Sequence, residues 1–445
     1  MKLIIALLIS TSLFAAAPKE KVKVNLNSAI QRMLQFNGEM AAERKDLDFA
    51  EGRMDQANAA WFPKSDLYIL AAPIFKETGN AFGTVKDYSK WSVFSNVKLT
   101  IIQPIYTFGV ISEYKKAAAS GYEVESQKVR SKEAELIYRL KQFYYGAQLA
   151  NDLFDIVKDG REKLENAISK AEGMLARNKI KREDMFALKA FYAQITTRYD
   201  EAQRLRDIAK KALAWVMGLS VDSDIELEEE SIAPEELELK PQDDYVAQTY
   251  ISRPEFKMLT SGIEATKALW QGQAKQKRPA FFAMGYGNLA FTPTNIRSPQ
   301  HNTYLNDPFN DMSGVFLLGL KFNLDWWTIN ALSKQSKAEY EKLAAEKDTL
   351  TEGMVLQVER AYREAVDNKN AIAYTKEGES NANKWMINAF MGYGMGFNEA
   401  RDLTDSLKAY FEAQLNYNLA IYNYNMALAD LTKFTGKEVV PSIKY

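Results

Sequence analysis

Apolar residues follow two different periods along this chain. In segments 91–103 and 313–324, apolar and polar residues alternate, which is the pattern of a strand with one apolar face. Segments 65–76 and 280–291 precede them and are typical of partner strands, so the sequence predicts two β-hairpins. Each strand has about 10 residues, the length that a tilted strand needs to cross a membrane.

Long helices are predicted between and after the hairpins. No proline occurs from Ile105 to Ala233 or from Phe309 to Val440, and good helix formers fill both stretches. Apolar residues recur there every three or four positions. As one helix, residues 109–178 would be roughly 100 Å long. This length is typical of a coiled coil or a helical tube and exceeds what a globular domain needs.

The chain is predicted to contain a duplicated unit. The phrase "LKAFYAQ" at 188–194 returns as "LKAYFEAQ" at 407–414, and three further segments match in the same order at nearly the same spacing. We therefore expect a first repeat at 18–232 and a second repeat at 245–436.

An acidic segment, residues 221–244, lies at the junction of the two repeats. It holds eleven acidic residues, one lysine and two prolines. This composition favours a linker or a small equatorial element outside the core. Residues 437–445 are expected to form a C-terminal tail.

The first 17 residues are typical of a secretory signal peptide. One basic residue precedes an apolar run from Leu3 to Phe14, and three alanines follow. The alternative is a buried N-terminal helix. No later run approaches 18 consecutive apolar residues, so no membrane-spanning helix is expected. An exported chain of this kind is periplasmic, secreted or an outer-membrane β-barrel.

Composition excludes several kinds of chemistry. The chain has no cysteine, which rules out disulfides and thiol catalysis, and its net charge of −1 does not favour nucleic-acid binding. The single histidine, His301, lies in a predicted loop without a catalytic partner. The glycine clusters "GYG" and "GMG" lack the strand–loop–helix setting of a phosphate loop. We expect no enzyme activity, no cofactor and no metal site.

Four strands cannot close a membrane barrel, because lipid does not tolerate open strand edges. Either the hairpins pack on the helices as part of a soluble protein, or several chains combine their strands. Three chains would supply twelve strands.

With these features the chain resembles the TolC-type outer-membrane efflux proteins, also called outer membrane factors. The resemblance rests on the duplicated helix–hairpin–helix unit, "QPIYTFG" at 103–109, "SRPEF" at 252–256 and the repeated "LKA…AQ" phrases. It implies an α+β membrane protein, a homotrimer whose 12-stranded barrel continues into a long α-helical barrel in the periplasm. The repeated phrases would mark corresponding helices of the two repeats.

The resemblance also implies a function and partners. The trimer would be a passive outer-membrane exit duct of a tripartite efflux or type I secretion system, opened at its periplasmic tip by a periplasmic adaptor and an inner-membrane transporter. The exported substrate and the identity of the partners are left open. An envelope-spanning structural or adhesive coiled-coil protein without conduction is the alternative, and a soluble periplasmic enzyme is a third reading.

The resemblance places a gate in "GYGMGFNEARDLTDSLKAY", residues 392–410. The family's constricting aspartates match Asp402 and Asp405, which lie three apart and so share a helix face. Positions of the links that hold the entrance closed match Tyr393 and Asp184. Asn398 stands where the family has an arginine, for which Arg401 is a possible substitute. Without the resemblance, the aspartate pair would be explained by helix capping.

Two local departures from the family pattern are visible. The sequence has "FNLDWW" where the second strand-to-helix corner usually contains a proline, so that bend is expected to differ. Asn178 and Lys179 stand where the first helical turn usually has a glycine.

Overall fold

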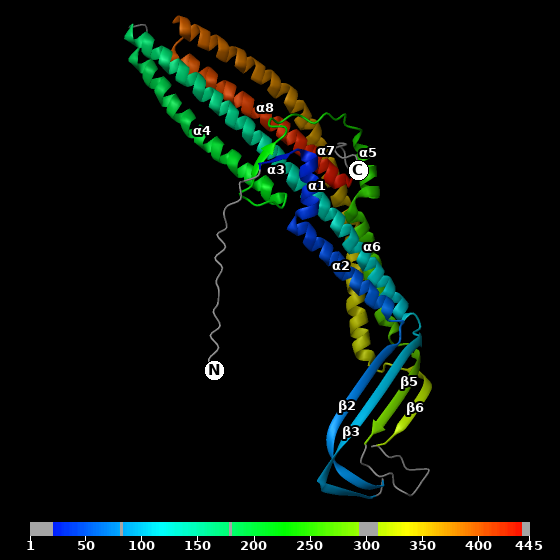
Figure 1. Ribbon diagram of the computed structural model, residues 1–445. Coiled ribbons are helices and arrows are strands. Elements are labelled where there is room, and N and C mark those ends of the chain that lie inside the picture. The colour runs from blue at the N-terminus through cyan, green and yellow to red at the C-terminus, as the bar shows by residue number, and fades with distance from the viewer. Residues whose placement is uncertain (1–20, 81–82, 178–179, 293–309, 438–445) are drawn as a thin grey trace, which may run out of the picture. The chain divides into compact units, whose positions relative to one another are not determined.

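A computed structural model describes residues 21–80, 83–177, 180–292 and 310–437 (Figure 1). The expected signal peptide, His301 and the Asn178–Lys179 turn lie outside the described residues, as does the tail after residue 437.

The chain is mostly helical with one larger sheet, as the two hydrophobic periods predict. Its elements, in chain order, are β1 (Lys21–Val24), α1 (Leu26–Phe36), α2 (Gly38–Ala59), β2 (Lys64–Asn80), β3 (Gly83–Tyr106), α3 (Val110–Ala176), α4 (Arg182–Val216), β4 (Asp224–Leu227), α5 (Gln242–Ser252), α6 (Pro254–Lys275), β5 (Ala280–Phe291), β6 (Met312–Lys321), α7 (Trp326–Met395) and α8 (Ala400–Thr435).

The strands differ from the predicted ones mainly in length. β5 has the predicted bounds, whereas β2 and β3 continue toward their shared turn, to Asn80 and from Gly83. The polar, glycine-containing residues at this turn hid the continuation, because alternation is weak there. β6 ends at Lys321, three residues early.

Two compact units make up the chain, and each takes segments from both predicted repeats. The first contains residues 1–45, 127–256 and 348–445, and the second contains residues 46–126 and 257–347. The predicted repeat boundaries therefore describe the sequence and do not coincide with the units of packing.

The second unit holds an antiparallel sheet in the order β2-β3-β5-β6. Register separates its two faces, because side chains alternate along each strand. Leu67, Leu99 and Gly287 share a row, and so do Ile69, Val97 and Leu289. The rows between them hold Tyr68, Lys98 and Asn288, or Asp66, Thr100 and Tyr286. One face is thus apolar or small throughout, and we call it the apolar face; the opposite face is largely polar.

The two strand-to-helix corners of this unit use different chemistry. Before α3, Phe108 and Gly109 both adopt left-handed backbone angles, with φ of 52° and 88°. Before α7, the side chain of Asp325 accepts from the backbone N–H of Thr328 at 3.4 Å, and Asn323 accepts from Asp325 N–H at 3.1 Å. The expected difference at "FNLDWW" is therefore a side-chain-capped helix start.

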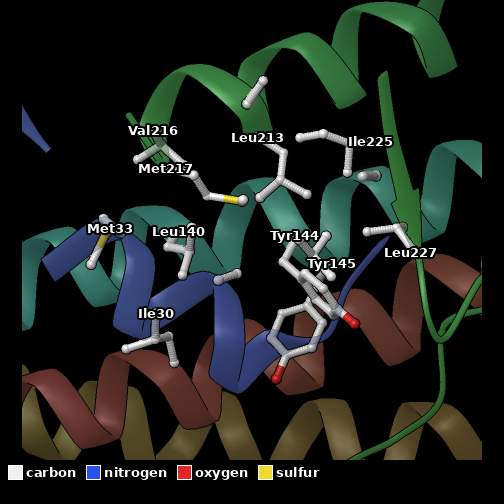
Figure 2. Close-up of a cluster of buried hydrophobic side chains, with 14 of the residues drawn as sticks. Ile30, Met33, Leu140, Tyr144, Tyr145, Leu213, Val216, Met217, Ile225 and Leu227 are labelled. Atoms are coloured by element: carbon white, nitrogen blue, oxygen red, sulfur yellow. The ribbon is translucent and has the colours of Figure 1, made fainter. Parts of the chain in front are cut away.

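The first unit has a core in which α1, α3, α4 and β4 meet (Figure 2). Ile30 and Met33 of α1 contact the cluster that also contains Leu140 of α3 and Leu213 of α4, and all four are fully buried. Tyr144 and Tyr145 extend this core toward β4 (Figure 2). The short strands β1 and β4 pair in parallel beside it.

The acidic segment 221–244 contributes to this core, and the expectation that it lies outside was wrong. Its acidic residues are mostly exposed, but Ile225, Leu227 and Ile232 alternate with them and are buried in the cluster. Beyond β4 it is held by side chains of the long helices. The Asp152 carboxylate accepts from Ile232 N–H at 2.9 Å, and Asn425 bonds Glu235 N–H and Ala233 C=O at 3.0 and 2.8 Å.

No helix in the described ranges is both long and apolar enough to cross a bilayer.

Candidate functional site: the ends of two helical hairpins

The candidate gate lies where two helical hairpins end. The α3–α4 and α7–α8 hairpins lie side by side, and their turns are at the same end (Figure 1). A hydrophobic cluster joins all four helices through Leu164, Ala171, Leu188, Phe191, Ala389, Tyr393, Leu403 and Leu407, among others. Leu188 and Leu407 come from the two copies of the repeated phrase, and both are fully buried. The repeated phrase thus supplies equivalent core positions in α4 and α8.

A glycine turn ends α7 immediately before the gate residues. Gly396 has φ +82°, its N–H donates to Tyr393 C=O at 3.0 Å, and Phe397 N–H donates to Gly392 C=O at 2.8 Å. This is the Schellman arrangement, which satisfies the last carbonyls of a helix. It positions residues 397–399 to lead directly into α8.

Asn398 packs back on this turn. A β-carbon at Gly392 would come within 2.5 Å of Asn398 Nδ2, so the two residues fit only because position 392 is glycine. The Asn398 side chain is therefore committed to its own turn in this chain. It does not make the link between helices that its position suggested.

The two aspartates are both exposed on α8. Asp402 lies in the first turn of the helix, and Asp405 lies one turn further. Arg401 Nε is 3.7 Å from Asp405 Oδ2, an i,i+4 pair whose arginine is 85% exposed. An exposed pair of this kind stabilises a helix by only about 0.3–0.5 kcal/mol. Arg401 thus contacts the predicted gate itself and makes no recorded link to another helix.

Tyr393 is the buried member of the predicted set. Its ring is in the hydrophobic cluster, and its hydroxyl has no hydrogen-bond partner among the described residues. Burial raises the pKa of Tyr393, and the Asp184 carboxylate adds to this rise. Tyr393 and Asp184 are therefore close, as the prediction requires, although no hydrogen bond joins them.

Asp184 has a local role at the start of α4. Its carboxylate accepts from Lys181 N–H at 3.2 Å, as the reciprocal half of a capping box. Capping, the ordinary explanation for acidic residues at a helix start, thus applies to Asp184. No corresponding bond involves Asp402, and the N-terminal cap of α8, Glu399, has no side-chain hydrogen bond.

Sequence reasoning missed two features of this unit. The glycine turn at Gly392 and Gly396 was signalled by glycine after a long helical pattern, the usual sign of a helix C-terminus. Arg253, within the motif "SRPEF", is a buried hub: its guanidinium donates to Met354 C=O at 3.1 Å and to Gln357 Oε1 at 2.6 Å, and Nε lies 3.1 Å from Glu255. No spacing rule gives contacts so distant in sequence.

Within the described ranges, no group of three or more His, Asp or Glu side chains is placed to hold a metal ion.

Comparison with known proteins identifies the fold. No protein-family model matches the sequence. The chain is similar to the alkaline protease secretion protein AprF of Pseudomonas aeruginosa, with 22% identity over 345 residues, 76% of this chain and 69% of AprF. Its structure matches the outer-membrane channel OprN with a TM-score of 0.76 at 13% identity, covering 94% of this chain and 91% of OprN. The CmeC outer-membrane channel of Campylobacter jejuni matches with a TM-score of 0.75 at 13% identity, covering 94% of this chain and 87% of CmeC.

These similarities agree with the resemblance drawn from the sequence. The chain has the fold of TolC-type outer-membrane channels along almost its whole length. The matched proteins are channels and a secretion component, not enzymes, which agrees with the expectation of no catalytic activity.

Proposed function

We propose that this chain, which has the fold of TolC-type outer-membrane channels, forms a homotrimeric exit duct in the outer membrane. Three copies of the four-stranded sheet would close a 12-stranded barrel, and the helical hairpins would form a tube in the periplasm. The observation that carries the proposal is the sheet of the second unit, with its apolar face and its two unpaired edges.

The edges are the first argument. In the order β2-β3-β5-β6, the described parts of β2 and β6 each pair with a neighbour on one side only. Unpaired backbone groups cost several kcal/mol each in hydrocarbon, so a membrane sheet must close on itself. Pairing β6 of one copy with β2 of the next satisfies both edges, and three copies complete a ring within the known range of barrel sizes.

The apolar face is the second argument. Ile69, Trp91 and Phe316 are 70%, 63% and 74% exposed in the chain, and they belong to its apolar face. So much exposed hydrocarbon marks a membrane or protein contact. Lipid around a closed barrel covers this face, and the polar face with Lys98, Asn288 and Asp66 then lines the interior.

The gate follows from the hairpin ends. In a trimer, Asp402 and Asp405 would bring six carboxylates together around the axis, a ring that favours cations and repels anions. We infer that Arg401 partly neutralises Asp405 in each copy. Tyr393, buried beside Asp184 without a hydrogen bond, would be released or recruited when the hairpins move between closed and open packing.

The partners are a periplasmic adaptor and an inner-membrane transporter, which would dock at the hairpin ends. The printed names of the similar proteins include both efflux channels and a protease secretion protein, so the cargo class is open. The alternative, a structural coiled-coil protein without conduction, leaves the apolar face of the sheet unexplained.

The experiment is to purify the protein from outer-membrane fractions and determine its mass in the detergent complex by native mass spectrometry. A mass of three chains supports the proposal. A substitution of Ile69→Asp on the apolar face is expected to remove the protein from the membrane fraction, whereas Thr100→Asp on the polar face is not. A monomer found in the periplasm would contradict the proposal.

A further inference from the structure

An exposed aromatic cluster lies in the part of the β2–β3 hairpin that extends beyond β5. Pairing between β3 and β5 ends at Ser95 and Phe291, so β3 residues before Ser95 pair with β2 alone. There the ring of Phe75 lies 5.2 Å from that of Tyr88, edge to face, and 4.4 Å from that of Trp91. Tyr88 and Trp91 remain 69% and 63% exposed.

An irregularity in β3 brings these rings together. Phe75 pairs with Trp91, but the next residue of β2, Lys76, pairs with Asp87, so three residues of β3, 88–90, have no partner in β2. Insertions of this kind re-aim side chains and are retained for a purpose. Here the insertion turns Tyr88 onto Phe75 and leaves Lys90 beside the aromatic rings.

Asp87 fixes the inserted residues. Its carboxylate accepts from Ser89 N–H at 3.0 Å and from the Ser89 hydroxyl at 2.5 Å. Lys90 Nζ lies 3.6 Å from Asp87, and its side chain is 65% exposed. The lysine is therefore loosely held and can extend toward an anion beyond the rings.

The cluster ends the apolar face. Trp91 shares that face with Val93, Val97, Leu99 and Ile101. Ten residues from Ile101 to Trp91 span about 33 Å along the strand. With a tilt of about 40° they rise about 25 Å, the height of the apolar band of outer-membrane barrels, which aromatic residues border.

We propose that Phe75, Tyr88, Trp91 and Lys90 anchor the hairpin in the headgroup layer of the membrane, with the rings among the headgroups and the lysine on lipid phosphates. The proposal rests on the proposed membrane function of the sheet. Amphipathic rings prefer the interface between hydrocarbon and water, and lysine near that interface contacts phosphate. The hairpin residues beyond Lys76 and Asp87 then stand outside the bilayer.

Depth is tested first, with the full chain reconstituted into vesicles of brominated phosphatidylcholine. The fluorescence of Trp91 is obtained as the difference between the protein and Trp91→Phe. Bromines at carbons 6 and 7 are expected to quench it more than bromines at carbons 11 and 12. Stronger quenching by the deeper bromines, or no quenching by either, overturns the placement in the headgroup layer.

The phosphate contact is tested by lipid retention in native mass spectrometry, with phosphatidylglycerol and phosphatidylcholine as probes. Lys90→Gln is expected to lower phosphatidylglycerol retention about threefold, as loss of one surface charge near anionic lipid implies. The matched control, Lys376→Gln on α7, is expected to leave retention unchanged. Equal retention in the two variants overturns the phosphate contact. Competition by 10-fold excess inorganic phosphate at roughly equal affinity would show a free-anion site in place of a lipid site.

Channel conductance separates this inference from the proposed function. Lys90→Gln and Tyr88→Ala are expected to conduct as the unchanged protein does. A protein that does not conduct but shows the predicted quenching and retention loses its proposed function and keeps this anchor. A conducting protein that fails both tests keeps its function and loses the anchor.

Discussion

Gly160 of α3 is a position where one added methyl group should separate packing from helix propensity. A β-carbon at Gly160 would lie 2.1 Å from Cζ of Phe411 on α8 and 2.7 Å from its Cε1. Ordinary contact between carbon atoms is about 3.5–4.0 Å. The Phe411 ring therefore rests directly on the α3 backbone, and the Gly160→Ala substitution forces ring or helix to move by more than 1 Å, on the order of the missing contact distance.

A second glycine of the same helix provides the control. Gly173 also lies within α3, and nothing approaches within 4 Å of where its β-carbon would be. Gly173→Ala is expected to stabilise by about 0.5–1 kcal/mol, because alanine loses less backbone entropy than glycine in a helix. Gly160→Ala has the same gain but an overpacking cost of about 1–3 kcal/mol, so the net effect is destabilising.

Thermal unfolding of the purified protein, followed by circular dichroism, measures the difference. At about 2.1 cal/mol/K per residue, a chain of this size shifts its Tm by about 1 °C per kcal/mol. We expect Gly173→Ala to raise the Tm slightly and Gly160→Ala to lower it by about 1–2 °C. Hydrogen exchange in the α3 and α8 segments around residues 160 and 411 should accelerate in Gly160→Ala alone.

A double variant completes the test. Phe411→Leu removes the ring that the new methyl group meets, so Gly160→Ala should cost less in the Phe411→Leu background, with a coupling energy of about 0.5–3 kcal/mol. A Tm that rises equally for Gly160→Ala and Gly173→Ala would refute the close contact. So would the absence of coupling between positions 160 and 411.

Two further predictions concern the first unit. Arg253→Met should lower the Tm by about 3–5 °C, because a buried arginine with three partners costs about 3–5 kcal/mol to remove, whereas Arg360→Met, at an 80% exposed i,i+4 pair, should shift it by under about 1 °C; equal shifts would contradict the hub. Burial raises the pKa of Asp152, so its contribution to stability is fully present below the unfolded pKa of about 3.9 and is lost as pH rises through the folded pKa. Asp152→Asn keeps an acceptor for Ile232 N–H and should therefore be more stable than the unchanged protein at pH 8 but not at pH 3.5, as denaturation across this pH range would show; a pH-independent difference would contradict the assignment.

Much of the fold followed from simple patterns. Alternation located the strands because each strand of the sheet has one apolar and one polar face, and the absence of proline indicated helices such as α3, which runs unbroken for 67 residues. The pattern failed where polarity and burial separate. In the acidic segment, Ile225, Leu227 and Ile232 are buried between exposed carboxylates, and eleven acidic residues concealed three core positions.

The candidate site was only partly predictable. Asp402 and Asp405 are exposed on one helix as their spacing indicates, and an i,i+4 rule accounts for Arg401 at Asp405. The commitment of Asn398 to Gly392 depends on the geometry of a glycine turn, and the contacts of Arg253 join residues about 100 positions apart. Such contacts arise from helix packing and leave no local pattern.

The central claim is that three copies form a conducting duct gated by carboxylates. Single-channel recording in planar bilayers tests it most directly, on the unchanged protein, on Asp402→Asn/Asp405→Asn and on Asp200→Asn/Asp207→Asn as an exposed control pair on α4. We predict cation-selective steps that lose their selectivity in the first variant and keep it in the second. Correctly folded trimers that carry no current would contradict the duct, and selectivity unchanged in the first variant would contradict the carboxylate gate.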